Sequence, residues 1–217
     1  MTVDNDETQN TLLCDRLPVV NTAEPHLPIV FLVDISASMT QDGAIDELNR
    51  FLQELHTFFR ENDYVAGITD ISIISFGADA KIELGFRSAE EYEVPTLSAN
   101  GPTSMNQALL LAFSEIQKRK DLYRSQGFKW CKACLFLLTD GLTANDGYQS
   151  EAVNEVRKAI EDKKIKYVPV GIGSADIKQL RKYYPKDKSD EFVFQTDVQN
   201  LVSVLMQLFE KFLFSII

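Results

Sequence analysis

The chain has 217 residues, of which 45% are hydrophobic and 10% aromatic, and its formal net charge at pH 7 is −10. This apolar content is enough for a packed core, which excludes a disordered chain, and the length suits one large domain or two small ones. The acidic balance argues against nucleic-acid binding, because phosphate contacts require clustered Lys and Arg side chains.

Residues 1–25 are predicted to form a flexible N-terminal arm, followed by one domain at residues 26–217. The first ten residues, MTVDNDETQN, lack the basic region and the apolar core of a secretory signal. The most apolar segment, LVSVLMQLFEKFLFSII, carries Glu210 and Lys211 and is shorter than a typical membrane span of roughly 20 residues. It predicts an amphipathic helix, so we expect a cytoplasmic protein without a membrane span.

After the arm, strand-like and helix-like segments alternate. Residues 28–34 (PIVFLVD) are an apolar run of strand length, typical of the buried centre of a parallel sheet. Residues 43–62 place apolar side chains at helical spacing, with Asp42 as the candidate N-cap. Two strands at 70–77 and 80–86, with a Gly-Ala-Asp turn between them, predict a β-hairpin.

The second half of the chain continues this alternation. Its predicted elements are a helix at 103–120, a strand at 133–140, a helix at 149–163, a strand at 165–173, a helix at 174–184, a short strand at 191–196 and a helix at 198–214. The order predicts an α/β fold, in which a doubly wound, mostly parallel central sheet with one antiparallel strand has helices on both faces. Ligands of such sheets bind outside the carboxyl ends of the strands.

Two apolar strands end in the same way, on Asp34 and on Asp140, and both side chains are expected at the carboxyl edge of neighbouring strands. Ser36 and Ser38 follow at alternate positions, and Thr103 lies in a loop before a helix. All five supply hard oxygen ligands, and no His or Cys lies nearby, which disfavours zinc and copper. Few carboxylates and several hydroxyls suit an octahedral ion that keeps waters, so the sequence predicts Mg²⁺, with Mn²⁺ as an alternative.

Each of these features also has an ordinary structural explanation. Thr103 or Ser104 is a candidate N-cap of the following helix, and Asp140-Gly141 is a common turn sequence. Aspartate and serine also leave strands in many loops that bind nothing. Only the combination, in this order along the chain, predicts a metal site.

The cysteines, Cys14, Cys131 and Cys134, do not suggest a secreted disulfide framework, because their number is odd. The WCKAC segment precedes a strand, whereas the pair in a thioredoxin active site opens a helix. A zinc site would need two further ligands, for which only Cys14, His26 and His56 are available. We interpret these cysteines as structural thiols, with zinc binding or redox chemistry as the alternatives.

Asp34-Ile35-Ser36-Ala37-Ser38, then Thr103, then Thr139-Asp140-Gly141 resemble the metal-ion-dependent adhesion site of von Willebrand factor type A domains. The resemblance runs from about Leu27 to the C-terminus. It is closest to the small, stand-alone bacterial A domains of the tellurium-resistance (TerY-like) group, through the segments PTLSANGPTSMNQAL and FLLTDGLTAND. This resemblance implies a bacterial stress-response setting of the tellurite-resistance type.

The resemblance also implies roles for the site residues. Ser36, Ser38 and Thr103 would contact the metal directly or through water, while Asp34 and Asp140 would act largely through waters. The open coordination position would take a Glu or Asp carboxylate from a partner protein.

Two features depart from the family pattern, which usually has Gly at position 37 and Gly-Gly before the threonine. Ala37 would cost about 1 kcal/mol relative to Gly if its φ were positive. Before Thr103 the chain has Gly101-Pro102, and proline is expected to stiffen this loop because it fixes φ and has no N–H.

We therefore expect a binding module and no enzyme. One alternative is a Mg²⁺-dependent phosphatase or phosphotransferase with Asp34 as nucleophile, but Ser36 occupies the position of the usual acid–base carboxylate. The other alternative is a scaffold whose metal site is disabled, for which Ala37 is the main support.

Overall fold

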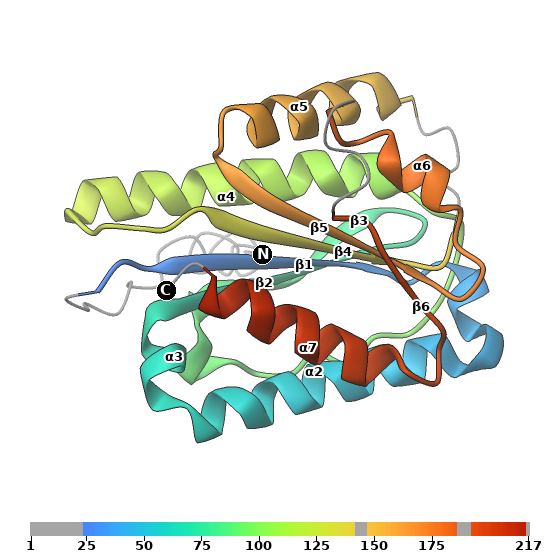
Figure 1. Cartoon of the computed structure of the whole chain (residues 1–217), viewed down its shortest axis with the longest axis horizontal. Coiled ribbons are helices and arrows are strands. Elements are labelled where there is room, and N and C mark those ends of the chain that lie inside the picture. The colour runs from blue at the N-terminus through green and yellow to red at the C-terminus, as the bar shows by residue number, and fades with distance from the viewer. Residues whose placement is uncertain (1–23, 142–146, 186–191, 216–217) are drawn as a thin grey trace, which may run out of the picture.

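A six-stranded sheet runs through the middle of the molecule, with helices on both faces (Figure 1). The computed structural model describes residues 24–141, 147–185 and 192–215. The strands are β1 (Leu27–Asp34), β2 (Thr69–Phe76), β3 (Ala80–Ser88), β4 (Ala133–Thr139), β5 (Ile165–Ile172) and β6 (Phe194–Thr196). Their order is β3-β2-β1-β4-β5-β6, and every neighbouring pair is parallel except β2 and β3. The predicted α/β fold, including the antiparallel hairpin strand, is confirmed.

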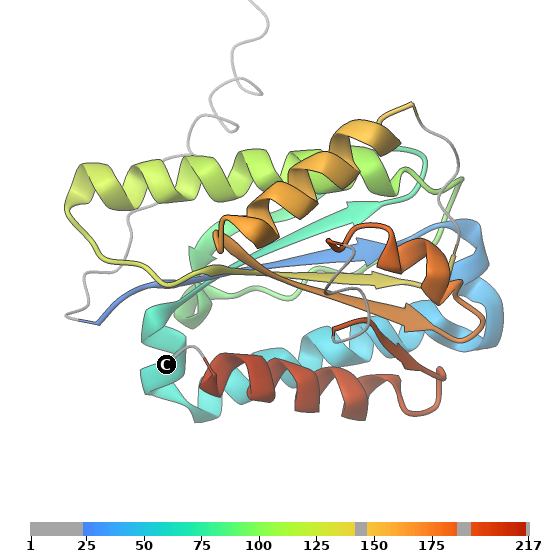
Figure 2. The ribbon, with the colours of Figure 1, turned by 45° about the horizontal axis from the view of Figure 1, so that its top comes forward.

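Two layers of helices enclose the sheet (Figures 1 and 2). One layer consists of α2 (Ala44–Glu61), α3 (Asp63–Ile68) and α7 (Leu201–Phe214), and the other of α4 (Met105–Gln126), α5 (Gln149–Glu161) and α6 (Ile177–Arg181). Two short 3-10 helices, η1 (Ala37–Gly43) and η2 (Ala89–Glu91), lie in the connections. Among the described residues, no helix has the length and apolar character needed to cross a membrane.

The central strand β1 shows why the sequence builds two cores. All its residues are buried, as they are in β4. Successive side chains of a strand point to opposite faces. Phe31 and Val33 therefore join the core under α2 and α7, and Val30 and Leu32 join the core under α4. A continuous apolar run is the pattern that a strand covered on both faces requires.

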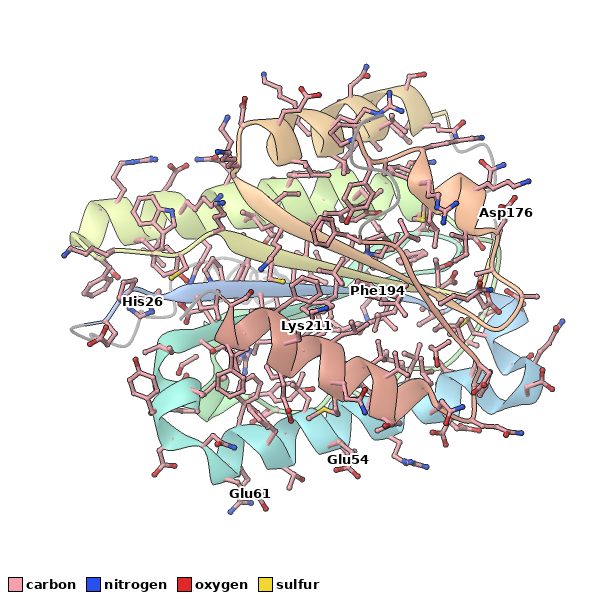
Figure 3. All side chains as sticks on the ribbon, in the orientation of Figure 1. His26, Glu54, Glu61, Asp176, Phe194 and Lys211 are labelled. Atoms are coloured by element: carbon pink, nitrogen blue, oxygen red, sulfur yellow. The ribbon has the colours of Figure 1, made fainter. Side chains whose placement is uncertain are left out.

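The helix α2 has the amphipathic pattern that the sequence predicts. Its apolar face is buried, whereas Glu54 and Glu61 are exposed and point away from the sheet (Figure 3). The predicted N-cap, Asp42, is wrong, because Gly43 holds that position. Asp42 and Gly43 have φ values of 53° and 75°, so they form a left-handed bend at the end of η1, directly before α2. The left-handed backbone at the N-cap position suits glycine, which has no Cβ.

Other boundaries also differ from the sequence-based prediction. The short helix α3 was not predicted, because six residues that include Gly67 are too few to show a helical period. Helix α4 continues to Gln126 and is followed by Gly127, the C-cap residue, which has a φ of 75°. Helix α6 is shorter than predicted and begins after Asp176, whose side chain accepts a hydrogen bond from Lys178 N. The division into an arm and a domain at residue 25 stays a prediction, because residues 1–23 lie outside the described part.

The carboxyl end of β1 lies at a topological switch point of the sheet. From β1 the chain passes to β2 on one side and later enters β4 on the other, so the strand order reverses between β1 and β4. Open α/β sheets bind ligands at such a switch point. The pairing of Val33 with Leu138 brings the ends of these two strands together.

Candidate metal-binding site

Four of the predicted ligands form one hydrogen-bonded cluster at the carboxyl ends of β1 and β4. The Ser36 backbone N–H donates to Asp34 Oδ1 over 2.8 Å. The hydroxyl oxygens of Ser36 and Ser38 lie 3.1 Å apart, and the Ser38 hydroxyl donates to Asp140 Oδ1 over 2.9 Å. Residues that are 102 positions apart in the sequence therefore share one small polar site.

A fifth residue of this cluster, Thr139, received no role in the sequence analysis. Its hydroxyl donates to Asp34 Oδ2 over 2.5 Å and accepts the Gly141 backbone N–H over 3.2 Å. Since Ser36 N holds the other carboxylate oxygen, both oxygens of Asp34 are oriented by the protein. The available signal was a threonine at the end of an apolar strand, next to Asp140.

Thr103 lies on a neighbouring loop, two residues before α4. Two backbone hydrogen bonds join this loop to the loop after β1: Ala37 N donates to Gly101 O over 2.9 Å, and Asn100 N donates to Ile35 O over 2.6 Å. The Thr103 hydroxyl makes no hydrogen bond to the described residues, and its side chain is half-buried. The structure therefore brings the Thr103 loop to the cluster without joining its side chain to the other four.

The alternative in which Ser104 caps helix α4 with its side chain is not what the structure shows. Ser104 occupies the N-cap position of α4, but its side chain does not cap the helix. Its hydroxyl and its backbone N–H both donate to Gly77 O, over 2.8 and 3.0 Å. Ser104 therefore anchors the loop to the turn between β2 and β3.

Ala37 fits its position without backbone strain. Among the described non-glycine residues, only Asp42 and Lys163 have a positive φ. The free-energy cost of alanine relative to glycine at position 37 applies only if φ is positive, so it does not arise here. Ala37 is exposed, and its N–H makes the bond to Gly101.

The electrostatics of the cluster favour a bound cation. Asp34 is fully buried, and burial raises the pKa of its carboxyl, while hydrogen bonds from Ser36 and Thr139 oppose the rise and the charge of Asp140 adds to it. Burial also raises the pKa of the half-buried Asp140, against the hydrogen bond from Ser38. Neither carboxylate has a Lys or Arg partner within the described ranges. A cation between them would supply the missing positive charge.

The donor set fits a hard divalent ion. It consists of hydroxyl and carboxylate oxygens, which suit Mg²⁺ and Mn²⁺. No group of three or more His, Cys, Asp or Glu side chains arranged to hold a metal occurs among residues that the structure describes. The two carboxylates here, Asp34 and Asp140, would therefore depend on the hydroxyls to complete a coordination shell.

The cysteines and histidines do not form a second metal centre within the described residues. Cys131 and Cys134 are free thiols, and burial raises the pKa of Cys134 to about 12. Such a thiol stays protonated and unreactive at neutral pH. Cys14 lies outside the described residues.

Comparison with known proteins supports the resemblance to von Willebrand factor type A domains. The family model of the von Willebrand factor type A domain matches residues 29–207. No curated protein matches the chain in sequence.

Solved structures with a similar fold include three adhesive or structural proteins. Proximal thread matrix protein 1 from the mussel byssus, with a zinc-occupied MIDAS motif, is 19% identical with a TM-score of 0.59, over 84% of this chain and 44% of that one. The pilus adhesin SpaC from Lactobacillus rhamnosus GG, in its open conformation, is 12% identical with a TM-score of 0.68, over 88% and 30% of the two chains. The vWF domain of the pilus tip protein Mfa5 from Porphyromonas gingivalis is 10% identical with a TM-score of 0.64, over 90% and 98%.

The present chain matches less than half the length of the mussel protein. At these identities the likeness shows the fold alone. The zinc ion belongs to the mussel structure, and the metal of the present chain has to be argued from its own residues.

Proposed function

The chain belongs to the von Willebrand factor type A domain family, and from this premise we propose that it is a divalent-metal-dependent module that captures an acidic side chain of a partner protein. The observation that carries the proposal is the Ser38 hydroxyl, which lies against both the Ser36 hydroxyl and Asp140. This contact gathers three oxygen ligands at the switch point of the sheet. Domains of this family commonly serve as metal-dependent protein-interaction modules.

Each residue of the cluster has a distinct role in this proposal. Ser36, Ser38 and Thr103 supply hydroxyl oxygens to the ion, and Asp34 and Asp140 act largely through waters. Thr139 orients Asp34 by donating to its Oδ2. When bound, Mg²⁺ supplies an electrophilic position for a carboxylate oxygen of the partner. Two protein carboxylates neutralise the formal charge of the ion, yet hydroxyls and waters leave it open to one more anionic ligand.

We further propose Mg²⁺ as the resident ion and a cytoplasmic bacterial stress-response system of the tellurite-resistance (TerY-like) type as the setting. The support for the ion is the all-oxygen donor set. The support for the setting is the resemblance of the segments PTLSANGPTSMNQAL and FLLTDGLTAND to that group.

Metal binding is tested with Mn²⁺ on the full chain, because free Mn²⁺ has an electron paramagnetic resonance signal that disappears on binding. We expect one Mn²⁺ per chain, displaced by excess Mg²⁺. Binding should be lost in Ser38→Ala and Thr103→Ala. Asp79→Asn, in the turn between β2 and β3, is the matched control and should bind as the unaltered chain does. If the unaltered chain leaves the Mn²⁺ signal intact, the site is disabled and the scaffold alternative holds.

Partner capture is tested with a displayed random-peptide library selected on the immobilised chain in Mg²⁺. The selected peptides should share an obligatory Glu or Asp, and their binding should be lost in EDTA, in the Gln or Asn analogue of the peptide, and on Ser38→Ala protein. Peptides that bind equally in EDTA, or that tolerate the amide analogue, would contradict capture through a metal.

We propose that the chain is not an enzyme. Ser36 and Thr139 donate hydrogen bonds to the oxygens of Asp34, which lowers the nucleophilicity of these oxygens. The phosphotransfer alternative also requires a general acid–base group, which neither of these two residues provides. Hydrolysis of p-nitrophenyl phosphate in Mg²⁺ should not exceed that of the Asp34→Asn variant. Turnover that Asp34→Asn abolishes would overturn this part of the proposal.

A further inference from the structure

A cavity of about 290 Å³ lies between α4, α5 and the start of β5. It is formed at the amino end of the sheet, because Ile165 is the first residue of β5, and it is therefore remote from the candidate metal site. Helix α4 contributes Phe113, Ile116 and Lys120 at helical spacing, and α5 contributes Lys158 and Ala159. Such a volume is near the lower end of the roughly 300–1,000 Å³ of small-molecule sites.

The cavity is basic in a protein whose net charge is −10. Lys120, Lys158 and Lys164 line it, against Glu155 as the lining residue of opposite charge. Lys164 is partly neutralised by Asp162, whose Oδ2 lies 2.9 Å from its Nζ. Lys120 has no carboxylate partner within the described part of the chain, and its ammonium donates to the Lys164 backbone oxygen over 3.2 Å.

Lys120 is held in an unfavourable environment for a cation. Its side chain is half-buried, and the pKa of its ammonium lies below the ordinary lysine value because burial disfavours the charge and Lys164 repels it. A partly buried lysine without a carboxylate partner gains a favourable interaction from an added anion. The remaining N–H groups of Lys120 are available for such a contact.

We propose that this cavity binds a small organic anion, with its carboxylate or phosphate group on Lys120 and Lys158 and its apolar body against Phe113, Ile116 and Ala159. Ile116 and Ala159 are buried and belong to the apolar part of the lining. The volume accepts a ligand of about the size of a substituted ring and is small for a folded peptide element. The inference does not depend on metal binding, since the two sites lie at opposite ends of the strands.

The test uses the full chain, labelled with ¹⁵N, and follows backbone amide shifts by NMR. The probes are phenyl phosphate and benzoate, which carry both an anionic group and a ring, with inorganic phosphate and benzyl alcohol as single-feature comparisons. We expect saturable shifts in residues 113–120 and 158–165 with one or both aromatic anions. Both single-feature probes should bind more weakly.

Lys120→Gln should weaken the affinity about tenfold or more, the loss expected for one charge-assisted hydrogen bond. Lys158→Gln should weaken it to a smaller extent, because its side chain is exposed. The matched control is Lys81→Gln, which removes the same charge from β3, at the other edge of the sheet, and should leave the affinity unchanged.

Three results would overturn the proposal. The first is that neither aromatic anion produces saturable shifts at the cavity. The second is that Lys120→Gln and Lys81→Gln weaken binding equally. In the third, benzyl alcohol or inorganic phosphate would bind as tightly as the aromatic anions, so that one of the two recognition elements would have no role.

Discussion

Replacing Asp70 by Asn should destabilise the fold by about 3 kcal/mol, because it removes the anion of a buried charged network. Asp70 is 1% exposed, at the amino end of β2. Its carboxylate accepts from Arg119 Nη2 over 2.6 Å and from the Tyr123 hydroxyl, and His26 Nδ1 lies 3.1 Å away. Figure 3 shows His26 at the amino end of β1, far from the carboxyl ends that form the candidate metal site.

The magnitude follows from the charge that remains. Arg119 is only 5% exposed, and loss of one partner from a buried pair costs about 3–5 kcal/mol, since the other charge stays buried and uncompensated. An asparagine oxygen still accepts one hydrogen bond, which places the expected cost at the lower end of that range.

The pH dependence gives this prediction a second test. Burial raises the pKa of Asp70, but the contacts with His26, Arg119 and Tyr123 outweigh burial and hold the pKa below its ordinary value of 3.8. A carboxyl with a lowered folded-state pKa contributes stability above its unfolded pKa, and loses it as the pH falls through the folded value. The difference between the two proteins should therefore be full at neutral pH and should shrink below about pH 4.

The assay is urea unfolding followed by the fluorescence of Trp130, the single tryptophan, whose ring stacks on Tyr123 at 5.9 Å between centroids. The control is Lys81→Gln, which breaks an ion pair whose lysine side chain is 71% exposed and should cost less than about 1 kcal/mol. A cost for Asp70→Asn no larger than that of the control, or one that is the same at neutral pH and at about pH 3, would refute the argument.

Three further predictions concern the candidate metal site. Asp140→Asn should abolish the rise in melting temperature caused by Mg²⁺ without destabilising the metal-free protein, because burial disfavours the carboxylate charge there; a metal-free variant that melts well below the unaltered chain would contradict this. Gly77→Ala should lower the free energy of unfolding by about 1–3 kcal/mol and weaken Mn²⁺ binding, since a Cβ would lie 2.6 Å from Asn100 O and displace the loop that leads to Thr103. An unchanged urea-unfolding curve would count against this prediction. Ala37→Gly should leave Mn²⁺ affinity within about twofold and should not stabilise the fold, because Ala37 has no positive φ that glycine would relieve. A variant more stable than the unaltered chain would contradict this prediction.

The sequence predicts the sheet and the cluster well because both follow from local patterns. The runs that become β1 and β4 are apolar throughout, which identifies strands buried on both faces. Asp34 and Asp140 end those runs, and the rule for parallel sheets then places them together at one edge. The hydrogen bond from Ser38 to Asp140 agrees with that placement.

Features set by tertiary contacts could not be predicted in this way. The role of Thr139 depends on the pairing of β4 beside β1, because this pairing brings its hydroxyl to Asp34. The left-handed bend at Asp42 and Gly43 joins η1 to α2, and the aspartate in it has a backbone that non-glycine residues rarely adopt. The cavity lysines lie on two helices and a loop, and only the packing of α4 on α5 brings them together.

The most direct test of the metal-dependent module is an anomalous difference map from crystals soaked in Mn²⁺. The proposal predicts a peak within about 2–2.3 Å of the hydroxyl oxygens of Ser36 and Ser38, on the side that faces Thr103. No peak, in a crystal form that leaves this edge of the sheet open to solvent, would contradict metal binding and leave a scaffold with a disabled site.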